Sequence, residues 1–297
     1  VQVVDVRKSS KFLAIRRQKT DVHDARGLAE LGRLGRSIGS PVFVKPMEHQ
    51  NIRTLINVRR TMLKNRARTD ALIQSIFRLH GGNVKLLNGR GALAAEVNDQ
   101  VRKMRQHGLE IGVNLQPLVD ISEALREQIS ALDRQMRDIA SNNLTCRNFQ
   151  TIPGVGAVIA LSFYSAIGDP HRFERSRDVG AYLGLTPTLY QSGATSRRGR
   201  ISRHGNKLTR MHLITAATVL LCRIEIESRL RTWGLELAQR VGFLKARVAV
   251  ARKLAVIMLG MWKTGSPFRP DGAPSLFLQQ EEAGLDPVLI SGTQISL

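Results

Sequence analysis

The stretch that decides the fold is residues 151–210, which read TIPGVGAVIALSFYSAIGDPHRFERSRDVGAYLGLTPTLYQSGATSRRGRISRHGNKLTR. Three signals follow one another in it: a Pro-Gly-Val-Gly turn at 153–156, a Gln-Ser-Gly turn at 191–193, and a run of basic residues from 197 to 210. The remaining chain is interpreted by how it would support and present these three signals.

The first turn lies between two apolar segments with helical spacing. Pro153 presets its own φ, and Gly154 and Gly156 can take positive φ. A tight turn of this kind directs backbone N–H groups outward at the start of the next helix, where the helix dipole favours a phosphate oxygen. This predicts a helix-hairpin-helix-like motif in which Gly154 and Gly156 bind nucleic acid. A turn that only packs two core helices fits the spacing equally well.

The second turn carries Ser192. Pro187 interrupts any helix just before it, so Ser192 is expected on a loop, where side chains can meet a substrate. A lone loop serine more often caps a backbone group or keeps the surface soluble. The basic run beside it changes that interpretation, because guanidinium groups clamp a phosphate and stabilise the charge that develops when a hydroxyl attacks phosphorus.

The basic run contains no acid, and its members are Arg197, Arg198, Arg200, Arg203, Lys207 and Arg210. We expect all six to bind nucleic acid. On charge alone, a solvated loop that binds RNA or DNA without chemistry is the more economical interpretation.

The order of motifs across the region is more specific than any one of them. Ala-Ile-Gly-Asp-Pro-His-Arg-Phe at 166–173 is followed by Gly-Ala-Tyr-Leu-Gly-Leu-Thr-Pro at 180–187, then by the Gln-Ser-Gly turn and Arg-Arg-Gly-Arg-Ile-Ser-Arg-His-Gly-Asn at 197–206. This resembles the C-terminal domain of the DEDD-type insertion-sequence transposases, the family that includes the Piv invertase. The family joins a RuvC-like acidic domain, a coiled coil and this domain, and some members are guided by a bridge RNA. The resemblance implies that Ser192 is the nucleophile that forms a phosphoserine with DNA.

Two acids near the start of the chain form a second candidate site. Thr20 is a suitable N-cap for a helix that starts at Asp21, which places Asp21 and Asp24 on one face of its first turn. Two such carboxylates could hold Mg²⁺, but acids are also favoured there by the helix dipole alone, and spacing by itself favours the dipole. Lys-Thr-Asp-x-x-Asp-Ala resembles the segment with the last two acids of the DEDD set, which implies that Asp21 and Asp24 are catalytic Mg²⁺ ligands.

The sequence departs from the family pattern before Asp21. The family's first Asp and its Glu lie much further upstream, whereas twenty residues precede Asp21 here. Residues 1–6 are typical of a strand, and Asp5 is interpreted as an ordinary strand residue. We therefore expect only a C-terminal remnant of the RuvC-like (RNase H-like) α/β domain, and a metal site with two of its four acids would bind Mg²⁺ poorly.

The expected fold class is mainly α. The pattern is helical over 48–80, and apolar residues recur at steps of three and four over 118–139. The second run favours a coiled-coil segment, an antiparallel pairing with 48–80, or a plain core helix. The expected domains are the RuvC-like remnant (1–45), a helical coiled-coil region (46–145), a transposase C-terminal domain with the helix-hairpin-helix-like motif (146–270) and a flexible tail (271–297).

Composition sets the class of partner. The formal net charge of +21 favours a polyanion, because each neutralised phosphate releases counterions. No apolar run approaches the ~20 residues of a membrane span, and the first residues lack a signal-peptide pattern. We therefore expect DNA as partner, no membrane, and a cytoplasmic, nucleoid-associated protein. Cys146 and Cys222 are far apart and are expected to be small core residues.

The functional hypothesis is a DNA transposase or site-specific recombinase that works through a phosphoserine with Mg²⁺ as cofactor. The resemblance adds a possible guide RNA and assembly as a homo-oligomer, a dimer or tetramer. The alternative is an inactive truncated transposase that only binds DNA or RNA. A helical scaffold that dimerises through 118–139 is a third interpretation, against which the charge argues, because no scaffold role requires it.

Overall fold

The computed structural model describes residues 3–4, 9–10, 13–14, 20–34, 42–86, 89, 91–192 and 195–271. The chain forms two compact units, Val1–Met47 and Glu48–Leu297, and each is considered by itself. Asp5 and almost all of the predicted tail lie outside the described residues.

The first unit contains helix α2, Asp21–Leu34. The helix starts where the sequence predicts, because the hydroxyl of Thr20 accepts a hydrogen bond from the amide of His23 at 3.3 Å. The amide of Val42 donates to the carbonyl of Val3 at 2.7 Å, which joins two extended pieces. Residues 9, 10 and 13 of this unit are also helical, and the amide of Ala14 donates to the carbonyl of Ser10 at 2.9 Å. The RuvC-like sheet stays a prediction.

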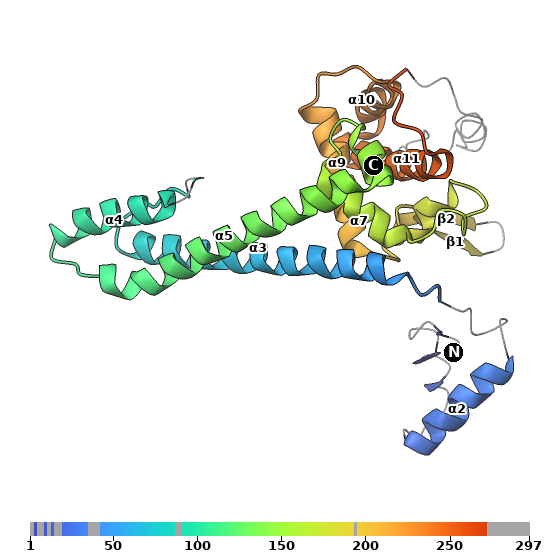
Figure 1. Cartoon of the computed structure of the whole chain (residues 1–297), viewed down its shortest axis with the longest axis horizontal. Helices are drawn as coiled ribbons and strands as arrows, with labels where there is room; N and C mark the ends of the chain where they lie inside the picture. The colour runs from blue at the N-terminus through green and yellow to red at the C-terminus, as the bar shows by residue number, and fades with distance from the viewer. Residues whose placement is uncertain are drawn as a thin grey trace, which may run out of the picture. The chain divides into compact units, whose positions relative to one another are not determined.

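The second unit begins with a long antiparallel pair of helices, α3 (Met47–Leu79) and α5 (Gly112–Asn142). They run side by side in Figure 1, with α4 (Ala92–Arg105) packed at their far end. An ion pair between Arg59 and Asp133 joins the two helices near the body of the unit. Of the pairings that the sequence left open, antiparallel packing within the chain is the one observed.

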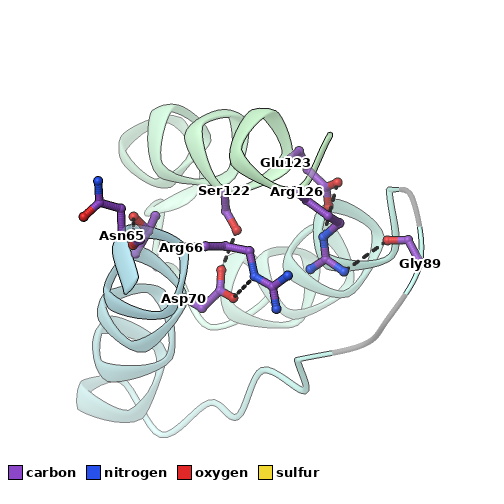
Figure 2. Close-up of polar contacts among 8 residues, drawn as sticks. Asn65, Arg66, Asp70, Gly89, Ser122, Glu123 and Arg126 are labelled. Atoms are coloured by element: carbon purple, nitrogen blue, oxygen red, sulfur yellow. Dashed lines mark hydrogen bonds and ion pairs between the residues drawn. The ribbon is translucent and has the colours of Figure 1, made fainter. Parts of the chain in front are cut away.

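A polar layer crosses this helix pair where a continuous apolar seam would be expected. Asp70 of α3 is only 3% exposed, and it accepts a hydrogen bond from the hydroxyl of Ser122 of α5 (Figure 2). Arg66, one turn earlier on α3, lies 3.4 Å from the other carboxylate oxygen. A buried carboxylate is tolerated only when it is paired and hydrogen-bonded, so this contact favours one register of α3 against α5.

Polar contacts continue along α5 just after Ser122. Arg126 lies 3.8 Å from Glu123 and donates to the carbonyl of Gly89 at 3.4 Å (Figure 2). Beyond the layer, a separate apolar core joins the three helices through Ile73, Phe77, Leu93 and Leu115, among others.

The rest of the second unit is a compact helical body. Its helices are α6 (Leu144–Gln150), α7 (Ala157–Ile167), α8 (Asp178–Tyr182), α9 (Lys207–Cys222), α10 (Arg229–Val241) and α11 (Phe243–Thr264). Ala216 and Ala217 are fully buried on α9, which allows α9 to lie close to its neighbours. Trp262 stacks on Tyr164, as expected of a core residue. Cys146 is buried as predicted, whereas Cys222 is exposed, because it ends α9 at the edge of the body.

The described sheet is a two-stranded antiparallel hairpin, β1 (Pro187–Ser192) and β2 (Thr195–Ile201). Sequence reasoning placed this segment in a loop. Threonine, tyrosine and isoleucine on the two arms favour paired strands, and the arms are joined by residues 193–194, which lie outside the described residues.

Candidate DNA-binding hairpin

Ser192 is the last residue of β1, and its Cα pairs across the hairpin with Thr195. The residue is exposed. The predicted loop position is therefore corrected to a strand end at the tip of a hairpin, a more ordered location that still leaves the residue open to a large substrate.

The second strand brings basic residues next to this serine. Arg197 pairs with Tyr190 and Arg198 with Leu189 across the hairpin. Arg197 and Arg200 are exposed, whereas the side chain of Arg198 lies outside the described residues. Leu189 and Tyr190 are exposed as well, at 61% and 64%, so the hairpin offers apolar surface between its cations. The sequence reasoning did not single out these two residues, although large apolar residues beside a run of arginines are a usable signal.

The base of the hairpin is fixed by contacts between backbones. The amide of Ser202 donates to Thr186 O at 2.8 Å, and the amide of Arg203 donates to Gly184 O at 3.2 Å. Gly184 has φ 69°, and a Cβ there would lie 2.2 Å from the carbonyl oxygen of His204. A Cβ on Gly205, whose φ is 74°, would lie 2.0 Å from Tyr182 O. These two glycines of the family motifs therefore permit an approach that any side chain would prevent.

Arg210 lies under this base instead of on the surface. Its side chain is 7% exposed, and its Nη1 donates to Leu183 O at 2.9 Å and to His204 O at 2.8 Å. Burial lowers the pKa of Arg210, and the nearby Arg203 lowers it further. The structure thus corrects the predicted surface position of Arg210: it ties together the two segments that flank the hairpin.

Lys207 and Arg203 remain exposed beside the same base. Arg203 has a positive φ of 56°, which is uncommon for a residue with a side chain. Lys207 opens α9, whose N-cap is Asn206: the side-chain oxygen of Asn206 accepts from the amides of Leu208 and Thr209. The exposed side chains of Arg203 and Lys207 therefore extend from backbone that hydrogen bonds hold in place.

The Asp-Pro-His-Arg-Phe motif packs against α8, the helix that precedes the hairpin. The guanidinium of Arg172 lies over the rings of Phe173 and Tyr182, 5.3 Å and 4.9 Å from their centroids. The hydroxyl of Tyr182 donates to the carbonyl of Ala166. The motif thus holds α8 against α7, and its arginine is occupied by protein contacts.

The Pro-Gly-Val-Gly turn joins α6 to α7, and its two glycines differ in environment. Gly154, with φ 88°, faces α9: a Cβ there would lie 3.1 Å from the carbonyl oxygen of Ala216. Gly154 therefore serves packing at this position. Gly156 is exposed, forms the N-cap of α7 and has open space around its Cα. Gly156 is open to solvent at the start of α7, and its predicted phosphate contact stays a prediction.

Asp21 and Asp24 lie in the first turn of α2, Asp21 exposed and Asp24 partly exposed. They belong to the first unit, whereas Ser192 belongs to the second. Across the described residues, no group of three or more His, Cys, Asp or Glu side chains could hold a metal ion. Two carboxylates one turn apart fit Mg²⁺ only where other oxygen ligands, such as water and substrate phosphates, complete the octahedron.

The described helices also bear on the membrane prediction. Within the part of the chain that the structure describes, no helix combines the length and the apolar character that a bilayer crossing requires.

Comparison with known proteins gives one family match, over the region that contains the hairpin, and several longer matches to single proteins. Residues 146–232, from α6 into α10, match the model of the "Transposase IS116/IS110/IS902 family". The chain is 29% identical over 268 residues to "Transposase for insertion sequence element IS1111A" of Coxiella burnetii, a match that covers 86% of this chain and 70% of the relative. It is 28% identical to a "Probable family 20 transposase" of Pseudomonas aeruginosa, covering 86% and 75%. A transposase of the element IS1328 from Yersinia enterocolitica is 33% identical over 48% of this chain and 43% of its own. Over residues 146–232 the chain is thus similar to the transposases of the IS116/IS110/IS902 family, and over most of its length it is similar to single transposases from Coxiella burnetii and Pseudomonas aeruginosa.

Proposed function

We propose that this protein is a transposase that cuts and rejoins DNA through a covalent phosphoserine bond at Ser192. The observation that carries the proposal is the position of this exposed serine at the tip of a hairpin whose second strand bears Arg197 and Arg200, both exposed. A hydroxyl in such a place can reach a backbone phosphate without entry into a closed pocket.

The proposed step exchanges one ester for another. The Oγ of Ser192 bonds to phosphorus, and one of the two bonds between that phosphorus and a deoxyribose oxygen breaks. The serine proton passes to solvent, and the departing deoxyribose oxygen takes up a proton. Attack by a deoxyribose hydroxyl then restores the free serine and rejoins the strand, so that neither ATP nor a redox partner is needed.

The cations around Ser192 have defined tasks in this step. Arg197 and Arg200 hold the phosphate next to the serine and offset the negative charge that grows on its oxygens. Arg203 and Lys207, at the base of the hairpin, bind flanking phosphates, and Gly156 at the start of α7 adds a backbone contact. We assign Arg198 the same role in holding the phosphate, because it lies on β2 between Arg197 and Arg200.

Asp21 and Asp24 would hold Mg²⁺, whose charge neutralises the phosphate under attack. Because they supply only two ligands, we expect metal affinity to rise when DNA is bound. The guide RNA and assembly as a dimer or tetramer, both implied by the resemblance, belong to the same proposal. RNA that copurifies with the protein, and its mass by light scattering with and without DNA, would test them.

The test is formation of a covalent adduct. The protein is incubated with labelled DNA that contains the element ends, Mg²⁺ and candidate guide RNA, and adducts are separated on a denaturing gel. Wild type and the control Ser141→Ala, an exposed serine on α5, are expected to give equal yields, and Ser192→Ala none. Equal yields from wild type and Ser192→Ala would refute the proposed role of the serine.

A second candidate is binding of DNA or RNA without chemistry. It is favoured by one observation, that the described residues hold no cluster of three or more metal-ligating side chains. In that case binding weakens with salt as phosphate contacts predict, while no adduct forms with any DNA, even when an intact acidic domain from a relative is supplied separately.

A further inference from the structure

Helix α3 carries a row of cations on one outward face. The row, called here the basic stripe, consists of Arg53, Arg60, Lys64 and Arg68. Steps of seven, four and four residues place these side chains within an arc of about 80° on an α-helix. Arg53, Lys64 and Arg68 are exposed and Arg60 is partly exposed, whereas Ile52, Ile56 and Ile73 of the same helix are buried.

The charge of this stripe is not neutralised within the described part of the chain. Between Glu48 and Asp70, α3 contains no acid. None of the four side chains forms an ion pair with another described residue.

Some other surface cations are paired: Arg33 with Glu30, Lys103 with Asp99, and Arg175 with Asp178. The neighbouring Arg59 and Arg66, which face α5, are likewise paired, with Asp133 and Asp70. On α3, therefore, the arginines that face α5 are paired with acids, whereas the cations of the outward stripe are not.

The spacing of the stripe suits an extended polyanion. Arg60, Lys64 and Arg68 lie on successive turns, about 6 Å apart along the axis, and the stripe spans about 22 Å from its first to its last member. A double helix presents roughly one phosphate charge per 1.7 Å of its axis, so long side chains on one helix face can contact several phosphates at once. Asn57 and Thr61 lie within or next to the same arc and are exposed, which leaves short polar groups between the cations.

We propose that the basic stripe binds the sugar–phosphate backbone of double-stranded DNA, as a contact separate from the β1–β2 hairpin. Continuity with the hairpin supports this choice. Ile52 and Ile56 of α3 belong to the same buried core as Leu208 and Leu213 of α9, so the first part of α3 lies against the helical body that carries α9. Lys207, which begins α9, belongs to the basic run at the base of the hairpin. DNA bound at the hairpin can therefore continue along α3.

The inference rests on the proposed function only in that its ligand is DNA. The test compares two variants with the same change in net charge. The stripe variant carries Arg53→Gln, Arg60→Gln, Lys64→Gln and Arg68→Gln. The control variant carries Arg102→Gln, Lys103→Gln, Arg134→Gln and Arg137→Gln, on exposed positions of α4 and α5. Glutamine is a good helix former, so the helices should persist, which circular dichroism checks.

The readout is the salt dependence of binding to a labelled DNA duplex, measured by fluorescence anisotropy. The slope of log K against log salt is negative, and each lost phosphate contact reduces its magnitude by about 0.9. We therefore expect the magnitude of the slope to be about 2 to 4 smaller for the stripe variant than for wild type. The control variant should lose less than about 1. Because Arg60 is partly buried, a triple variant that retains it is measured in parallel and should lose about 2.

Three results would overturn the inference. In the first, stripe and control variants lose equal slope, which would reduce the effect to overall charge. In the second, the loss appears with an RNA duplex and not with DNA. In the third, the stripe variant changes the mass of the protein in solution while its slope for DNA is unchanged, which would assign the face to contacts between copies. Ser192→Ala separates the two proposals, because it should abolish the covalent adduct while the salt dependence of its DNA binding stays the same as that of wild type.

Discussion

Replacement of Arg210 by alanine separates a structural arginine from its DNA-binding neighbours. Two carbonyl oxygens, on Leu183 and His204, accept from the buried Nη1 at 2.9 Å and 2.8 Å. A charged hydrogen bond contributes about 1.5–3 kcal/mol, and a buried carbonyl that loses its partner costs about 1–3 kcal/mol. Because one nitrogen serves both acceptors, we expect Arg210→Ala to lower the free energy of unfolding by roughly 3 kcal/mol.

The matched control is Lys207→Ala, one turn earlier on α9 and exposed. It should change the free energy of unfolding by less than about 0.5 kcal/mol, and it should lower the salt slope of DNA binding by about 0.9. Urea denaturation gives the first quantity and anisotropy the second. Arg210→Lys should recover part of the stability, because an ammonium can still reach one carbonyl. If Arg210→Ala is as stable as Lys207→Ala and loses one unit of salt slope, the buried-clamp reasoning fails.

Other consequences can be tested on the same protein. Gly184→Ala should destabilise by more than about 2 kcal/mol in urea denaturation, because a positive φ and a Cβ contact of 2.2 Å coincide there, whereas Gly156→Ala should be nearly neutral. With iodoacetamide on the native protein, Cys222 should be labelled and Cys146 should not, because burial raises the pKa of the Cys146 thiol to about 12; modification of Cys146 at a comparable rate would contradict its burial. Burial and the charges of Arg59 and Arg60 lower the pKa of His212 to about 4 from 6.5. As pH falls below 6.5 the unfolded chain therefore takes up a proton that the folded chain excludes, and stability should drop by up to about 3 kcal/mol by pH 4. His212→Gln should remove this part of the pH dependence, and an unchanged profile would count against it.

Much of the helical architecture follows from local pattern. The apolar spacing of residues 48–80 predicts α3 (Met47–Leu79) within a residue at each end, and Thr20 marks the start of α2 correctly. Helical periodicity and caps are local signals, which one sequence contains in full. The sequence did not decide whether α3 pairs with α5, because an apolar stripe on one helix does not identify the helix that packs against it. The contact between Asp70 and Ser122, two polar residues far apart in sequence, was not detectable as a pair.

The candidate site was harder to predict in detail. The β1–β2 hairpin was missed because β2 consists largely of arginine, serine and glycine, and its pairing depends on β1 and on the backbone contacts beneath it. Arg210 was assigned by charge to the surface. A signal for its burial existed: Leu213, Ala217 and Leu220 follow at steps of three and four, which puts Arg210 on the buried stripe of α9. The basic stripe of α3 was not singled out from the sequence, because which cations of α3 face outward depends on how α3 packs against α5.

The most direct test of the proposed chemistry is to locate the covalent bond by mass spectrometry. An adduct formed with DNA, Mg²⁺ and guide RNA is digested with nuclease and protease, and its peptides are sequenced. A nucleotide attached to the hydroxyl of Ser192 is the predicted result. A nucleotide attached to any other residue would contradict the account.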